Sequence, residues 1–146
     1  MEVRRRSASG QATGSRDHVA TVRAVYEAFT AGDHVTPFEH YHPSIEWKAM
    51  DSRWDEGLYH GHAGVKEFWR RWLGSWDEYS IEVTELLGVR EHVLAQVVMA
   101  ALGKNSGVPV SLAHFQVWTF DADGLITHVR FFQERPDALR AVGLAH

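Results

Sequence analysis

Three side chains with polar or aromatic character alternate along the apolar stretch "SLAHFQVWTF", residues 111–120. Side chains alternate between the two faces of a strand, so His114, Gln116 and Trp118 share one face. A neutral imidazole can donate or accept a hydrogen bond, and it is the side chain best suited to proton transfer near neutral pH. A glutamine amide can orient a carbonyl or a water but is not a base. His114 is therefore a candidate general acid or base, with Gln116 as a candidate ligand contact. The alternative is a buried pair whose members hydrogen-bond each other.

The carboxylate candidates lie together in "MDSRWDEGLY", which contains Asp51, Asp55 and Glu56. A carboxylate at the rim of an apolar pocket has its pKa raised by desolvation, as a base that works near neutral pH requires. Asp51 continues the alternation of Trp47 and Ala49 in the preceding segment and is the catalytic candidate of the three. The alternative is that all three are solvated loop acids.

Aromatic side chains are abundant, with six tryptophans, four tyrosines and seven phenylalanines in 146 residues. Tryptophan often lines pockets or interfaces. The aromatic residues that could line a cavity for a flat or polycyclic ligand are Trp47, Trp54, Phe68, Trp72, Trp118 and Phe131. Some of them can equally be ordinary core, because an aromatic stripe on a helix is more often packing than a binding site.

Two histidine pairs, in "HYH" and "HGH", raise the question of a metal site. Structural and catalytic zinc sites need three or four protein ligands fixed in space. The four histidines lie at the ends of predicted elements, where histidines are commonly solvated or act as caps, and the chain contains no cysteine. We therefore expect neither a metal nor another cofactor.

The charge is distributed unevenly along the chain. The first 16 residues carry four arginines and one glutamate, a net charge of +3, which leaves −7 for the rest of a chain whose total is −4. An acidic body argues against nucleic-acid binding. The segment "MEVRRRSASGQATGSR" lacks an apolar core, so it is neither a secretory signal nor a membrane span. Its composition predicts a disordered tail over residues 1–16, followed by one domain over residues 17–146. The absence of cysteine is compatible with a cytoplasmic protein.

The periodicity of apolar residues predicts helices in the first half of the chain and strands in the second. A helix should begin at a capping Asp17 and end before Gly32, and a short helical piece with Pro37 near its start should stop at Pro43. "SIEWKAM" predicts a strand, "DSRWDEGLYHG" a loop, and "HAGVKEFWRRWLGSW" an amphipathic helix with Trp72 and Trp76 on its apolar side. The later elements are strands over Tyr79–Val89, His92–Leu102, Pro109–Phe120 and Leu125–Glu134, and a closing helix over "RPDALRAVGL". This order indicates an α+β fold, a curved antiparallel sheet with helices on one face and a pocket between them.

Five segments of the chain, taken together and in order, resemble one protein family. They are "VRAVYEAFTAGD", "YHPSIEWKA", "YHGHAGVKEFWRRWL", "FQVWTFDADGLITHVRFF" and "DALRAVGL". The chain resembles a SnoaL-like protein of the nuclear transport factor 2-like superfamily over about residues 17–144. The resemblance implies a conical α+β barrel of a mainly antiparallel sheet, with helices on its concave face around an apolar cavity. It also implies a metal-free protein that is usually dimeric.

The resemblance also orients the candidate residues. It turns the face of His114, Gln116 and Trp118 inward, and with it Gln96, Val98 and Ala100 of the preceding strand. It turns Trp47 and Ala49 inward, and hence Asp51. The inner positions that it implies for the last strand are Val129, Phe131 and Gln133, none of them acidic, whereas polyketide cyclases and epoxide hydrolases of this fold use acidic inner residues.

Ketosteroid isomerase, of the same superfamily, uses an aspartate base with a tyrosine and a protonated aspartate. The resemblance puts Val25 at that tyrosine, Ala49 at the base and Gln116 at the protonated acid, so this activity is not expected. Tyr26 is one position away, about 100° round the helix, which favours core packing or a ligand contact over oxyanion stabilisation.

Three functions remain open, and the first two place a hydrophobic small molecule in the pocket. The first is a metal-free acid/base enzyme of cyclase, isomerase, dehydratase or epoxide-hydrolase type, acting on an apolar ketone or polyketide-like molecule. The second is a non-catalytic binding or accessory protein, and the third is a dimerisation module with a vestigial pocket. The outer face of the predicted hairpin is itself largely apolar, so a homodimer through that face is expected. The residues assigned to this outer face are Val97, Met99, Phe115, Val117, Thr119, His128, Arg130 and Phe132.

Overall fold

The computed structural model describes residues 10–49, 57–104 and 106–144, with the backbone alone for residues 10–15 and 77. The helices are α1 (Gly10–Thr30), the short 3-10 helix η1 (Thr36–His40), α2 (Gly61–Leu73) and α3 (Arg135–Ala141). The strands are β1 (Tyr41–Lys48), β2 (Leu58–His60), β3 (Trp76–Val89), β4 (His92–Gly103), β5 (Pro109–Phe120) and β6 (Ile126–Phe132). The predicted α+β fold is confirmed.

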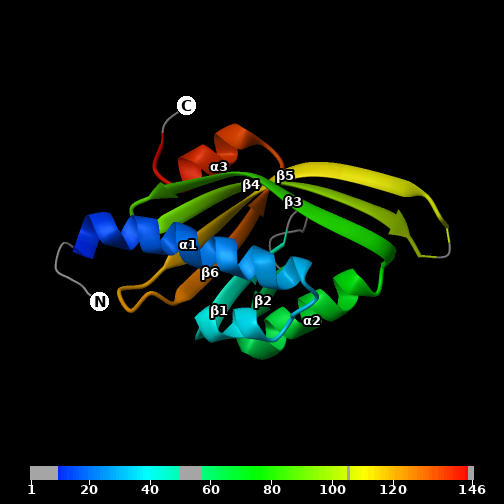
Figure 1. The fold of residues 1–146 in the computed structure, drawn as a ribbon, viewed down its shortest axis with the longest axis horizontal. Helices are drawn as coiled ribbons and strands as arrows, with labels where there is room; N and C mark the ends of the chain where they lie inside the picture. The colour runs from blue at the N-terminus through cyan, green and yellow to red at the C-terminus, as the bar shows by residue number, and fades with distance from the viewer. Residues whose placement is uncertain (1–9, 50–56, 105, 145–146) are drawn as a thin grey trace.

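The six strands form one sheet in the order β2-β1-β6-β5-β4-β3. Strands β3 to β6 form an antiparallel meander, whereas β1 lies parallel to β6. The turn between β5 and β6 is stabilised by Asp121, whose carboxylate accepts the backbone N–H groups of Asp123 and Leu125 at 2.9 and 3.0 Å. The sheet is therefore mixed and does not close into a barrel. In Figure 1 the β3, β4 and β5 strands extend beyond the end of α1.

The two faces of the sheet are covered by different helices. Helices α1 and α2 pack against the inner, concave face through Val22, Val25, Val65 and Phe68, which share one cluster with Trp118. Helix α3 packs on the outer face, in a second cluster that contains Leu94, Phe115, Val117, Ala138 and Val142. Figure 1 shows α1 crossing the sheet and α3 on the other side of β4 from α1. The expected helices on the concave face are α1 and α2, and α3 buries much of the outer apolar surface.

The register of β4 differs by one residue from the expected one. His114 lies opposite Val97, Gln116 opposite Ala95, and Gln96 opposite Phe115. Residues directly opposite each other in an antiparallel pair share a face, so Gln96, Val98 and Ala100 face outward and Val97 and Met99 face inward. The expectation for these five residues is wrong, because a slip of one position moves every side chain of a strand to the other face.

Four predicted boundaries are also wrong. Helix α1 begins at Gly10, so Asp17 lies inside it and does not cap it. Pro43 lies within β1 instead of ending the preceding turn, and Leu58–His60 form a short strand instead of a loop. Trp76 begins β3 and is not part of α2. Residues 1–9 lie outside the described residues, so the disordered tail stays a prediction for them.

None of the described helices is both long enough and apolar enough to cross a bilayer.

Candidate ligand-binding site

Four buried side chains form a chain of hydrogen bonds along the inner face of β5. The indole Nε1–H of Trp118 donates to the hydroxyl oxygen of Tyr26 at 3.1 Å. The Tyr26 hydroxyl donates to Oε1 of Gln116, and the amide Nε2–H of Gln116 donates to Nε2 of His114 at 3.0 Å. An indole nitrogen and an amide nitrogen can only donate, which fixes the direction of the chain. Nε2 of His114 is thus an acceptor, and the proton of the neutral ring is on Nδ1.

Strand alternation and helix packing bring these four residues together. His114, Gln116 and Trp118 are successive inner positions of β5, and Tyr26 reaches them from α1, with its ring edge-on to Trp118 at 5.6 Å between centroids. Their exposed fractions are between 2% and 9%. Burial raises the pKa of Tyr26 far above its ordinary value and lowers the pKa of His114. Both groups are therefore uncharged near neutral pH.

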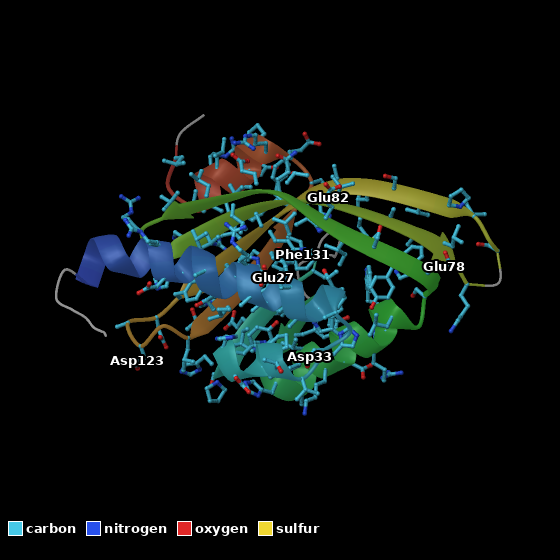
Figure 2. The ribbon with its side chains drawn as sticks, in the orientation of Figure 1. Glu27, Asp33, Glu78, Glu82, Asp123 and Phe131 are labelled. Carbon is cyan, nitrogen blue, oxygen red and sulfur yellow. The ribbon has the colours of Figure 1, made fainter. Side chains whose placement is uncertain are left out.

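The Nδ1 atom of His114 is buried and has no hydrogen-bond partner among the residues that the structure describes. The imidazole stacks on Phe131, with ring centroids 5.6 Å apart and planes inclined by 11°. Figure 2 shows Phe131 near the middle of the molecule, between Glu78 at one extremity and Asp123 at the other. An N–H group in such surroundings costs about 1–3 kcal/mol when it is left unpaired. Nδ1 of His114 is therefore a buried donor that the described residues leave unpaired.

His114 lies on a recess of about 260 Å³, which we call the His114 recess. Its other lining residues are Ala49, Phe68, Trp72, Trp76, Met99, Val110, Leu112 and Phe131. No charged side chain is among these described lining residues. The recess can therefore hold an apolar molecule, and two of its lining residues, His114 and Trp76, each carry a buried ring nitrogen with no hydrogen-bond partner among the described residues.

A second, much smaller volume lies at the other end of the hydrogen-bonded chain. This central cavity of about 30 Å³ is lined by Tyr26, Trp47, Gln116 and Trp118 among others. A cavity needs about 10–15 Å³ of such volume for one water, so the central cavity fits one or two waters and no polycyclic ligand. Trp47 and His34 also line this cavity, and Nε1 of Trp47 and Nδ1 of His34 are buried with no partner in the described part of the chain.

The structure divides the predicted site residues into three groups. His114, Phe68, Trp72 and Phe131 line the recess. Gln116, Trp118, Trp47 and Tyr26 line the central cavity. Gln96 belongs to neither, because it faces outward. Asp51, Trp54, Asp55 and Glu56 lie outside the described residues.

Sequence reasoning missed four recess residues, one of which is Met99, assigned to the outer face by the one-residue error in register. Val110 and Leu112 continue the inner alternation of His114 along β5, so the strand pattern could have found them. Trp76 was assigned to the preceding helix, because its spacing of four residues from Trp72 also fits a helix.

One histidine of each pair makes a local contact with the backbone. Nδ1 of His42 accepts the backbone N–H of Ser44 at 2.9 Å, and Nε2 of His62 lies 2.9 Å from the carbonyl oxygen of Tyr41. In the described part of the chain, no three metal-ligating side chains come together.

Comparison with known proteins identifies the family. A family model described as a SnoaL-like domain matches residues 22–129, well over half of the chain. The chain therefore belongs to the SnoaL-like domain family, as the sequence resemblance predicted. No curated protein sequence matches it.

Many solved structures share the fold. An NTF2-like protein of unknown function from Burkholderia pseudomallei is 23% identical with a TM-score of 0.71, covering 86% of this chain and 97% of its own. TerC, crystallised with polyporic acid, is 20% identical with a TM-score of 0.68, covering 86% of this chain and 97% of its own. A protein named as a candidate polyketide cyclase from Xanthomonas campestris is 18% identical with a TM-score of 0.68, covering 89% of this chain and 99% of its own. At these identities the likeness establishes the NTF2-like fold.

Proposed function

We propose that this protein binds an apolar ketone or polyketide-like molecule in the His114 recess, and that His114 donates a hydrogen bond from Nδ1 to the ligand's carbonyl oxygen. The observation that carries the proposal is the buried Nδ1 of His114, which has no partner among the described residues and belongs to a residue that lines the recess. The aromatic lining supplies apolar contact, and a single oriented donor among apolar walls is how ligand pockets fix orientation.

The hydrogen-bonded chain suits His114 to donation rather than to proton abstraction. Its Nε2 lone pair is already held by the Gln116 amide, and its Nδ1 carries the proton. Burial lowers its pKa, so the donor is a neutral imidazole. A neutral imidazole can polarise a carbonyl, as in triosephosphate isomerase. His114 would then stabilise the negative charge that develops on the oxygen when a neighbouring C–H is deprotonated.

A reaction of this kind also requires a base, and Asp51 is our candidate for it. Asp51 comes three residues after the end of β1. It lies outside the described residues, so we propose its role from the sequence alone. A metal-free cyclase or isomerase would need this pairing of a carbonyl donor with a carboxylate.

Two of the structural relatives favour a small-molecule role. TerC was crystallised with polyporic acid, and the protein from Xanthomonas campestris carries a polyketide cyclase name. From these two relatives we carry over to this protein only the class of ligand, an organic small molecule that fits an apolar pocket.

Binding can be tested with a matched pair of probes, 2-acetylnaphthalene and 2-ethylnaphthalene, which differ in one carbonyl. We expect the protein to bind the ketone at least tenfold more tightly, about 1.4 kcal/mol. In His114→Phe, which keeps a ring and removes both nitrogens, the ketone should bind about tenfold more weakly and the hydrocarbon should be unaffected. Calorimetric titration measures both constants, and the melting temperature of the variant is the control for folding. Equal affinity for the two probes would refute the proposal.

A non-catalytic binding protein is the second candidate, and the uncharged lining of the recess in the described residues favours it. The two candidates are separated by incubating 2-acetylnaphthalene in D₂O and following its acetyl protons by nuclear magnetic resonance. An enzyme of the proposed kind should speed deuterium exchange at the acetyl group, and Asp51→Asn should abolish the acceleration while leaving the ketone's dissociation constant within about twofold. Exchange at the buffer rate in the presence of tight binding would identify a binder.

We also propose a homodimer through the part of the outer sheet face that α3 leaves uncovered. Helix α3 buries Phe115 and Val117, so the remaining surface lies on the extended strands, around Val98 and Ala113. Both face outward, as the β4–β5 register requires.

A further inference from the structure

Strand β3 is an edge of the sheet, and its outer edge is long and regular. In the strand order only β4 lies next to β3, so no strand of the described residues pairs with its other edge. The pairing with β4 is regular over residues 78–83, between two shifts of register. An edge strand presents unpaired backbone N–H and C=O groups, to which another extended chain can pair. Residues 78–83 therefore form a backbone edge that can accept a seventh strand.

The side chains of residues 78–83 differ in kind between the two faces of the sheet. The inward residues are Tyr79, Ile81 and Val83, and the outward residues are Glu78, Ser80 and Glu82. The inward residues are half-buried and the outward residues are exposed. Residues on a neighbouring strand pair with those on the same face. A strand added here would therefore meet apolar side chains on one face and polar or acidic side chains on the other.

A groove of about 400 Å³ lies between β3 and α1, on the inner side of this edge. Its floor includes Ile81, Val83 and Leu86, which are half-buried against the core. Arg23 and Glu27 of α1 also line it, and both are exposed. Apolar side chains of an added strand would be covered in this groove, and their burial would stabilise the complex.

The exposed charge along this edge is mainly acidic. Glu27, Glu78 and Glu82 make no ion pair with the other described residues, whereas Glu85 is paired with Arg135 at 2.8 Å. Figure 2 shows Glu78 and Glu82 along β3 and Glu27 on α1. Like charges that face each other on paired strands are destabilising. Pairing of β3 with β3 of a second copy would bring acid beside acid, so a basic segment is the better partner.

We infer that the free edge of β3 binds an extended peptide segment of another protein, in which basic and apolar residues alternate. Its backbone continues the sheet at residues 78–83, its apolar side chains enter the groove beside α1, and its basic side chains lie next to Glu78 and Glu82. This surface shares no lining residue with the His114 recess, so the inference stands apart from the proposed function.

The first test compares two peptides of the same composition. One alternates four lysines with three valines, and the other carries the lysines and the valines in separate blocks, both with blocked ends. We expect the alternating peptide to bind at least fivefold more tightly, because only alternation puts the charges on one face and the apolar groups on the other. Calorimetric titration measures both dissociation constants. Equal affinities would mean that charge alone attracts the peptide, and would overturn the inference.

A charge reversal on the strand tests the acidic side of the surface. Glu78→Lys should weaken binding of the alternating peptide at least fivefold, because a like charge then faces its lysines. The matched control is Glu39→Lys on η1, an exposed acid that does not line the groove, and it should change the affinity by less than twofold. Both substitutions are on the surface, so the melting temperature should move by only a few degrees. Equal weakening by the two variants would contradict a site on β3.

Amide hydrogen exchange followed by nuclear magnetic resonance locates the bound peptide. Saturation with the alternating peptide should slow exchange at least tenfold at the amides of residues 78–83 that point to the free edge, because a new strand accepts their hydrogen bonds. Unchanged exchange at all of these amides, with the peptide bound, would overturn the inference.

Discussion

At the scale of single residues, the site is organised by the direction of its hydrogen bonds. Tyr26 is the junction, because its hydroxyl both accepts from Trp118 and donates to Gln116. The direction continues through Gln116 to His114. The side-chain carbonyl of Gln116 accepts from Tyr26, so Gln116 can offer the imidazole only an amide N–H. The tautomer of His114 thus depends on a residue of α1 that does not line the His114 recess. Tyr26 positions the donor rather than contacting the ligand.

Removing that junction should destabilise the protein. Tyr26→Phe leaves the Trp118 N–H and the Gln116 carbonyl unpaired in the core, at about 1–3 kcal/mol each. We expect urea denaturation to show a loss of about 2 kcal/mol or more in the free energy of unfolding. The matched control is Tyr41→Phe, because Tyr41 is equally buried but lies outside the hydrogen-bonded chain. Similar losses in the two variants would mean that packing, not the hydrogen bonds, makes Tyr26 important.

The lowered pKa of His114 predicts how stability depends on pH. Burial lowers it from the ordinary value of 6.5, so below about pH 6.5 the unfolded chain binds a proton that the folded chain does not. Stability should be full above that pH and fall as the pH drops toward the folded-state pKa. Burial is also the main cause of the lowered pKa values of His18 and His92, which add to the same trend.

His114→Phe isolates the share of His114 in this pH dependence. We expect the variant to lose less unfolding free energy than the unaltered protein between about pH 7.5 and pH 5, because one of the three histidines with a lowered pKa is gone. Urea denaturation at the two pH values measures the difference. Equal losses would show that His114 titrates normally in the folded protein.

At the scale of elements, alternation in β5 predicted the inner face of the site, and hydrophobic pattern predicted most of the elements. The register between β4 and β5 could not be obtained in the same way. It depends on the length and geometry of the connection after Gly103, and a one-residue difference exchanges Gln96 for Val97 beside His114. Helix α3 was predicted as an element, but its packing face was not. The outer apolar residues were therefore assigned to a partner subunit, although α3 covers Phe115 and Val117.

The burial of the outer face by α3 can be tested at Ala138. This residue is fully buried against the cluster of Leu94, Phe115 and Val117. Ala138→Asp places a charge there, and we expect it to cost several kcal/mol and to lower the melting temperature by more than about 10 °C. Arg140→Gln, on the exposed side of the same helix, should change it by only a few degrees. A small effect of Ala138→Asp would show that α3 detaches readily from the sheet.

At the scale of the whole molecule, the recess and the proposed dimer face lie on opposite sides of the same strands. Inner positions of β4 and β5 such as Met99 and Leu112 line the recess, and outer positions such as Val98 and Ala113 face away from it. Helix α3 covers the outer side of β4 and β5 only around Leu94, Phe115 and Val117, so among the described residues no helix lies over the outer side of the extended strand ends (Figure 1). A second copy packed there would stiffen the strands that hold His114 without contributing a residue to the recess.

The dimer should be visible as mass in solution. Light scattering at micromolar concentration should give twice the chain mass of 16.6 kDa. Val98→Glu should convert the dimer to a monomer, because it places a carboxylate on the outer face directly beside Glu82 of β3 and its two-fold mate. The inner core is not touched by this substitution, so the melting temperature measured at low protein concentration should stay within a few degrees of the unaltered protein. A monomeric mass for the unaltered protein would refute the dimer. A dimer that persists in Val98→Glu would place the interface elsewhere on the surface, away from the extended strands.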